Sequence, residues 1–126
     1  MLTINYSSNV VSVGSVFTIK SLVSFSVRDC KRIVLNDIPP NNVKYLHLSN
    51  KESTQYHWED LVYFPNLEVV TLANFQFESV PNNFPQNLKK ITISKGHTNL
   101  ETLNQLSELT SIEELNLIDV SLKVIK

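Results

Sequence analysis

Few side chains in this 126-residue chain have the types and spacing that chemistry requires. Cys30 is its single cysteine, and a thiol becomes a nucleophile where its surroundings lower its pKa. Three histidines, His47, His57 and His97, would form a metal site only if the fold brought them together. The chain has two glycines, which are too few for a glycine-rich loop that binds phosphate. The elements that position Cys30 and the histidines therefore decide what these residues can do.

Charged neighbours supply the remaining candidates for chemistry. Glu59–Asp60 and Glu113–Glu114 are adjacent carboxylates, and such pairs on exposed segments indicate a solvated face rather than a facing acid–base pair. Arg28 lies beside Asp29 and has the chemistry of an arginine finger toward a GTPase partner, although most such arginines are ordinary contact residues. We therefore predict no catalytic residue, no cofactor and no metal site.

A short apolar phrase recurs six times along the chain. It consists of an apolar residue, two variable residues, an apolar residue, one variable residue and a third apolar residue, as in Leu67-Val70-Leu72. The six copies begin at residues 1, 22, 43, 67, 88 and 112, so their offsets are 21, 21, 24, 21 and 24 residues. One supersecondary unit is therefore repeated, and residues 1–126 are predicted to form a single repeat domain.

The phrase and its period resemble the leucine-rich repeat, L-x-x-L-x-L-x-x-N/C-x-L. The resemblance implies an α/β solenoid with a parallel β-sheet on its concave side and short helical or extended returns on its convex side. Positions 1, 4 and 6 of each phrase would point inward, where each copy buries its apolar side against the next. Cys30 falls at position 9, where the family commonly has an inward cysteine, so a buried and inert thiol is expected. The three histidines would fall on a strand, a return and a turn, which separates them too widely for one metal ion.

Position 9 departs from the family pattern in most copies. The family usually has Asn or Cys there, but the third to sixth copies have Lys51, Phe75, Gly96 and Val120. Asn50 and Asn74 fall one residue early and would satisfy backbone groups after a local shift of register. We therefore expect irregular turns in these copies.

The return segments are of two kinds. Apolar residues spaced by three in 58–64 and 103–109 predict one or two helical turns, with Thr102 or Ser107 supplying polar ends. Prolines in the returns of the second and fourth copies predict extended segments instead, similar to those of bacterial effector repeats. Residues 1–21 fit either an ordinary first repeat or a hairpin-like cap that turns at Gly14-Ser15.

Composition narrows the class of partner. The net charge is −1, and the sequence has no basic stripe of the kind that neutralises the phosphates of a nucleic acid. No apolar run is long enough to span a membrane, and the start does not resemble a secretory leader. A lone cysteine favours a reducing compartment. We therefore expect a cytoplasmic protein, or one in the cytosol of a host cell if the chain is an effector.

The outward positions of the strands are the best functional candidates. Aromatic residues and arginine dominate the energetics of protein interfaces, so Tyr45 with His47, beside the following strand, is the predicted centre of the site. The residues predicted to contact a partner are Arg28, Tyr45, His47, Val69, Thr71, Ala73, Lys90 and Thr92. The resulting hypothesis is a non-enzymatic module that binds a protein partner. The alternative for Tyr45 is that it merely covers a neighbouring strand.

Two other functions remain open at this point. Neither end of the chain has an obvious polar cap, and Ser121–Lys126 is too short to cover a whole repeat, so a homodimer through a terminal repeat is expected. Such a chain would be a structural or self-assembling protein. The third possibility is the targeting part of a longer effector.

Overall fold

The chain adopts a mixed α/β fold in which most elements are parallel strands, which confirms the predicted class at that level. The computed structural model describes residues 2–6, 10–12, 14–30, 32–34, 38–56, 58–77 and 84–123. The strands within them are β1 (Leu2–Tyr6), β2 (Val10–Ser12), β3 (Leu22–Cys30), β4 (Arg32–Val34), β5 (Tyr45–Gln55), β6 (Val69–Gln76), β7 (Lys90–Ser94), β8 (His97–Asn99), β9 (Glu114–Ile118) and β10 (Ser121–Lys123). The helical segments are η1 (Gly14–Thr18), η2 (Trp58–Tyr63) and α1 (Leu100–Ser107).

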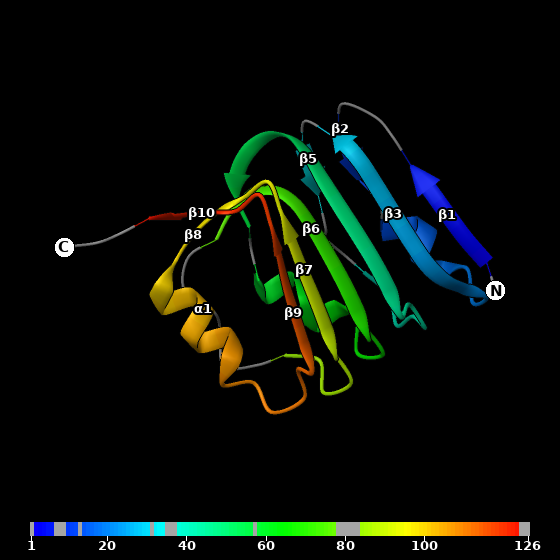
Figure 1. Cartoon of the computed structure of the whole chain (residues 1–126). Helices are drawn as coiled ribbons and strands as arrows, with labels where there is room; N and C mark the ends of the chain where they lie inside the picture. The colour runs from blue at the N-terminus through cyan, green and yellow to red at the C-terminus, as the bar shows by residue number, and fades with distance from the viewer. Residues whose placement is uncertain are drawn as a thin grey trace.

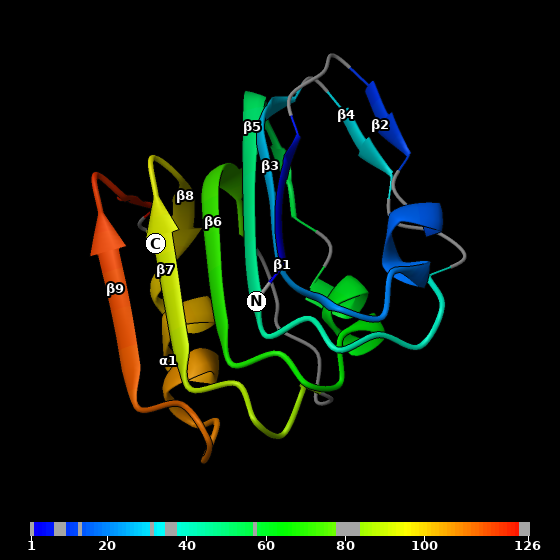
Figure 2. The ribbon, with the colours of Figure 1, turned by 90° about the vertical axis from the view of Figure 1, so that its right-hand side faces the viewer.

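The main sheet follows the order of the chain. Its strands run β1-β3-β5-β6-β7-β9, and each is parallel to the next (Figure 1). Parallel neighbours need a return segment between them, and Figure 2 shows η1, η2 and α1 on one side of the sheet. Two shorter pairings, β8 with β6 and β10, extend the sheet, while β2 and β4 pair separately. Among the described strands the sheet is open, and β1 and β9 are its two edges.

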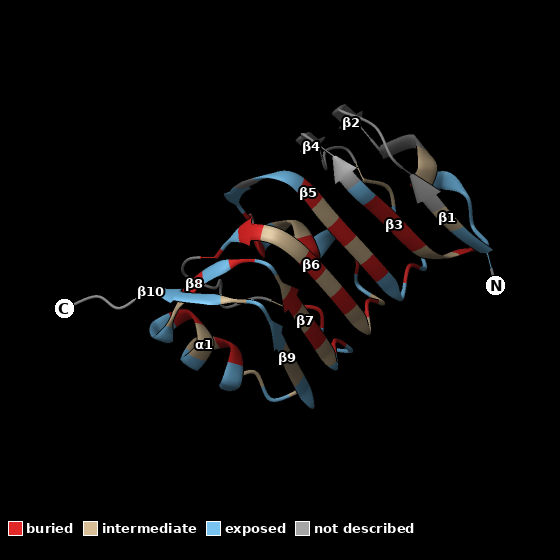
Figure 3. Cartoon of the chain, turned by 45° about the horizontal axis from the view of Figure 1, so that its top comes forward, coloured by how far each residue is buried: buried red, intermediate tan, exposed pale blue. Residues whose placement is uncertain are grey.

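The pairing register follows the predicted phrase. Position 4 of each copy pairs along one row, which runs Ile4, Phe25, Leu46, Val70, Ile91 and Leu115. Position 6 forms a second row, which runs Tyr6, Val27, Leu48, Leu72, Ile93 and Leu117. Both positions are buried in the second to fifth copies (Figure 3), which confirms the predicted core there. Leu117 is 41% exposed, because β9 has no described strand on its outer side.

One turn recurs before the strands. The N–H of the residue at position 1 of the phrase donates to the carbonyl oxygen of the residue three positions earlier. This bond closes a turn and sets the start of the strand. These bonds are Leu22 to Ile19 at 3.1 Å, Leu67 to Phe64 at 3.1 Å, Leu88 to Pro85 at 3.2 Å and Ile112 to Leu109 at 3.2 Å. Val43 differs, because its N–H donates to Oδ1 of Asn41 at 3.2 Å.

Helical returns occur in the two places that the spacing predicts. η2 buries Trp58 and Leu61, and α1 buries Leu106. The polar start of α1 is Asn99, whose Oδ1 accepts from the N–H of Thr102 at 2.8 Å. Of the two residues predicted to supply polar ends, Thr102 is instead buried within the helix, whereas Ser107 lies at the C-terminal end, where its Oγ donates to the carbonyl oxygen of Asn104 at 2.7 Å.

The first return does not contain the turn of a hairpin. Gly14–Thr18 is the 3-10 segment η1, and β2 pairs in parallel with β4, whereas the strands of a hairpin are antiparallel. β1 also pairs in parallel with β3, as an ordinary first copy would. The predicted extended return of the second copy contains β4, while most of the fourth return, residues 78–83, lies outside the described residues.

The bends after the strands are irregular, as expected. Asn74 Nδ2 donates to the carbonyl oxygen of Asn50 at 2.8 Å, and Asn50 Nδ2 donates to that of Glu52 at 2.5 Å, so the two displaced asparagines do satisfy backbone groups. Asn74, Lys95 and Asp119 occupy position 8 of the last three copies, and their φ values are 64°, 55° and 52°. Asparagine adopts this left-handed region more readily than most residues, whereas lysine does so at a cost.

Candidate functional site

Side chains of the main sheet alternate between two faces. One face packs against the helical segments, and the other, which we call the open face, carries positions 3, 5 and 7 of each phrase. On β5, β6, β7 and β9 the open face consists of Tyr45, His47, Ser49, Val69, Thr71, Ala73, Lys90, Thr92, Ser94, Glu114, Asn116 and Ile118. Most of these side chains are half-buried, whereas Tyr45 is 40% exposed.

Strands β5 and β6 bring five of the predicted contact residues together. Tyr45 pairs with Val69 and His47 pairs with Thr71, while Ala73 follows along β6. Paired residues on adjacent parallel strands lie about 4.8 Å apart, so these side chains are neighbours on the open face. The predicted centre of the site is therefore a continuous patch in the middle of the sheet.

Strand β7 extends the patch by two further predicted residues. Lys90 pairs with Val69 and Thr92 pairs with Thr71. Lys90 Nζ lies 3.0 Å from Oε2 of Glu114, and this hydrogen bond, with the positive charge of Lys90, lowers the pKa of the Glu114 carboxyl. Both side chains are exposed, so the pair adds little stability but neutralises the charge at this side of the patch.

Arg28 is the predicted contact residue that the structure does not place in the patch. It is exposed on β3, but the pairing of β3 with β5 shifts between Val27 and Cys30. Val27 pairs with Leu48 and Cys30 with Asn50, so two residues of β3 stand opposite one of β5. An extra residue of this kind bends a strand and redirects its side chains, so the expected column from Arg28 across β5 is interrupted.

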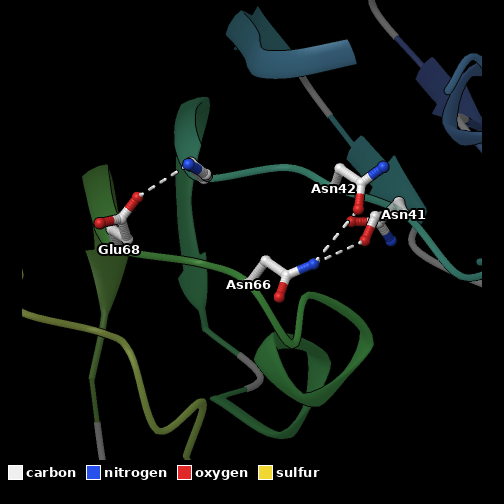
Figure 4. Close-up of polar contacts among 5 residues, drawn as sticks. Asn41, Asn42, Asn66 and Glu68 are labelled. Atoms are coloured by element: carbon white, nitrogen blue, oxygen red, sulfur yellow. Dashed lines mark hydrogen bonds and ion pairs between the residues drawn. The ribbon is translucent and has the colours of Figure 1, made fainter. Parts of the chain in front are cut away.

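The start of the strands carries a polar network that the sequence reasoning missed. Asn66 Nδ2 donates to the carbonyl oxygen of Asn41 at 3.3 Å and to Oδ1 of Asn42 at 3.4 Å (Figure 4). Asn41 Nδ2 in turn donates to the carbonyl oxygen of Tyr63 at 2.9 Å. The signal was present, because asparagine occurs directly before the phrase at residues 42, 66 and 87. These hydrogen bonds connect the segment before β5 with the segment before β6.

No described arrangement supports metal chemistry. His47 lies on β5 and His97 on β8, while His57 is outside the described residues. Within the described part of the chain, no group of three metal-ligating side chains comes together. The backbone of Cys30 belongs to β3, but its side chain is not described, so its burial stays a prediction.

Comparison of the chain with protein families, with curated proteins and with solved structures gave no significant match. Among the helices that the structure describes, none is long and apolar enough to cross a membrane.

Proposed function

We propose that the chain is a leucine-rich-repeat solenoid that binds a protein partner on the open face of its sheet and catalyses no reaction. On this proposal the open face is the concave side, and the helical and extended returns form the convex side. The observation that carries it is the register of β5 with β6, which sets exposed Tyr45 beside Val69 and next to His47.

The proposed mechanism is rigid presentation. Parallel strands with buried apolar rows hold the outward side chains in fixed columns, so binding costs little ordering of the protein. Tyr45 supplies a large contact surface with few rotatable bonds and a hydroxyl that can hydrogen-bond. Val69 adds apolar surface beside it, Ala73 continues that surface further along β6, and Lys90 with Glu114 forms a polar rim. An apolar centre with a polar rim is the usual anatomy of a protein interface.

Affinity capture with paired variants tests this proposal. Wild-type protein and the Tyr45→Ala/His47→Ala variant are immobilised and exposed to extract of the native cells, and retained proteins are quantified. The Val62→Ala/Tyr63→Ala variant is a matched control, because Tyr63 on η2 is 41% exposed against 40% for Tyr45. We expect at least one protein whose retention falls about tenfold or more with the first variant only, because truncating an aromatic anchor costs 2 kcal/mol or more. Equal loss from both variants, at unchanged melting temperatures, would place the contact elsewhere.

A further inference from the structure

The edge of the sheet at β9 is built like the interior strands but has no described strand beside it. β9 pairs with β7 and β10 pairs with β8, each on one side only. Leu117, Ile118 and Leu122 are 41%, 53% and 52% exposed, whereas Ile93, in the same row as Leu117, is 0% exposed. Figure 1 shows β10 following β9 after a bend at this end of the sheet. An unpaired edge offers N–H and C=O groups to a further strand.

Charges at the start of the strands indicate what kind of strand fits there. Position 2 of the last four copies is Lys44, Glu68, Lys89 and Glu113, which alternate in sign. Backbone hydrogen bonds join each of these residues to the one before, at 2.8 Å in all three cases. Lys44 Nζ lies 3.8 Å from Glu68 Oε2. β9 therefore presents an acidic residue, Glu113, at this position, which favours a lysine at the matching position of a neighbouring strand.

Position 3 gives the same indication. Lys90 on β7 contacts Glu114 on β9 from one side, and the other side of Glu114 faces the open edge. The side chains of Glu113 and Glu114 are both exposed there. A strand placed next to β9 therefore meets the carboxylate of Glu113 and that of Glu114, which is already paired with Lys90, followed by the apolar residues Leu115 and Leu117.

A second copy of the chain fits this edge less well. The opposite edge strand, β1, has Leu2 and Thr3 at positions 2 and 3, so it brings no positive charge to the carboxylates. An antiparallel pair of two β9 strands centred on Asn116 would set Glu113 of one copy opposite Asp119 of the other. Like charges directly opposite one another destabilise strand pairing.

We propose that the β9–β10 edge binds an extended peptide as an additional parallel strand, and that this peptide has lysine at its start followed by alternating apolar residues. The backbone supplies affinity, the two glutamates select the basic start, and Leu115 and Leu117 accept the apolar side chains. Glu114 also belongs to the rim of the open face, whereas Leu115 and Leu117 lie outside it, so a change at Leu117 tests the edge independently of changes at Tyr45 and His47.

The chain itself provides the probe. We use a fluorescent peptide with the sequence of residues 88–96, Leu-Lys-Lys-Ile-Thr-Ile-Ser-Lys-Gly. In the folded chain this sequence contains β7, which pairs in parallel with the other side of β9. Binding of the peptide to the whole protein is measured by fluorescence anisotropy at low and high salt. The control peptide carries Lys89→Glu and Lys90→Glu. We expect the native sequence to bind at least tenfold more tightly than the control at low salt, and the difference to shrink at high salt.

Two protein variants locate the binding. Leu117→Lys places a charge on the proposed edge, and Val62→Lys places one on η2 at a residue that is 49% exposed. We expect Leu117→Lys to weaken binding of the native peptide at least tenfold and Val62→Lys to leave it unchanged. Equal binding of the two peptides to the wild-type protein, or equal binding by both variants, would overturn the proposal. So would a concentration-dependent mass in light scattering that Leu117→Lys abolishes, because the occupant would then be a second copy.

Discussion

Gly96 explains at the residue scale why position 9 of the fifth copy departs from the Asn/Cys pattern. A Cβ built on Gly96 would lie 2.8 Å from the carbonyl oxygen of Phe75 and 3.0 Å from the ring of Phe77. No side chain fits against a backbone oxygen at that distance, so the position has no room for asparagine or cysteine. The exception in the sequence pattern thus reflects close packing between neighbouring copies.

Gly96→Ala is therefore expected to destabilise the protein by about 2 kcal/mol, within the usual range for overpacking a filled site. Urea denaturation of both proteins measures the difference. Ser94→Ala, two residues earlier on the open face, is the matched control and should change stability by less than about 0.5 kcal/mol. A Gly96→Ala protein as stable as wild type would show that β6 and β8 do not approach as described.

Tyr56 carries a second prediction at this scale. It is 5% exposed and packs edge-on against Trp58 and Phe75, and its hydroxyl has no hydrogen-bond partner within the described part of the chain. Burial without a partner costs free energy, so Tyr56→Phe is expected to stabilise the protein by about 1 kcal/mol. Loss of stability in the variant, measured by thermal or urea denaturation, would mean that the hydroxyl has a partner after all.

The same residue predicts a pH dependence. Burial, with the nearby charges of Asp60 and Glu59, raises the pKa of the Tyr56 hydroxyl above its ordinary value. Because the folded state disfavours the ionised form, stability is fully present below the unfolded pKa of about 10 and falls as the pH rises above it. Wild-type protein should therefore lose more stability than Tyr56→Phe between about pH 9.5 and 11. Parallel loss in the two proteins would contradict this assignment.

At the element scale, the apolar rows determine where each strand lies. Leu72 and Ile93 are both 0% exposed and pair directly. Substituting either by alanine is therefore expected to lower the free energy of unfolding by about 2 to 5 kcal/mol. Leu117 occupies the same row but is 41% exposed, so Leu117→Ala should cost less than about 1 kcal/mol. Chemical denaturation of the three variants tests the gradient. Equal losses at Ile93 and Leu117 would show that the β9 edge is covered.

Much of the sheet was predictable from sequence, because position 4 and position 6 carry apolar residues in every copy and their spacing sets the register. The helical returns η2 and α1 were predictable from apolar residues spaced by three, whereas the 3-10 segment η1 was not predicted. The bulge near Arg28 was not, because an extra residue in β3 leaves the apolar phrase intact and changes only the pairing after Val27. The cap at Asn99 was missed because it lies before the apolar spacing that indicated the helix.

At the scale of the whole molecule, the chain has two surfaces of different chemistry. The open face has an aromatic centre at Tyr45 in the middle of the sheet, whereas the β9–β10 edge combines carboxylates with backbone that no described strand pairs on its outer side. Columns of the open face were predictable, because strands in register place equivalent positions side by side. The proposed preference of the edge for lysine was not predictable, because it depends on which strands lie next to one another in the folded sheet. The predicted homodimer stays a prediction that light scattering tests.

Site-specific photo-crosslinking in the native cells tests the central claim, a protein partner on the open face, most directly. A photoreactive phenylalanine analogue replaces Tyr45 on the open face, Tyr63 on η2 or Leu117 on the β9 edge, in three separate proteins. All three positions are similarly exposed, at 40%, 41% and 41%, so differences in yield report on location rather than access. The account predicts a discrete adduct with one partner from position 45 that is absent from position 63. Adducts from position 63, with none from position 45, would contradict it.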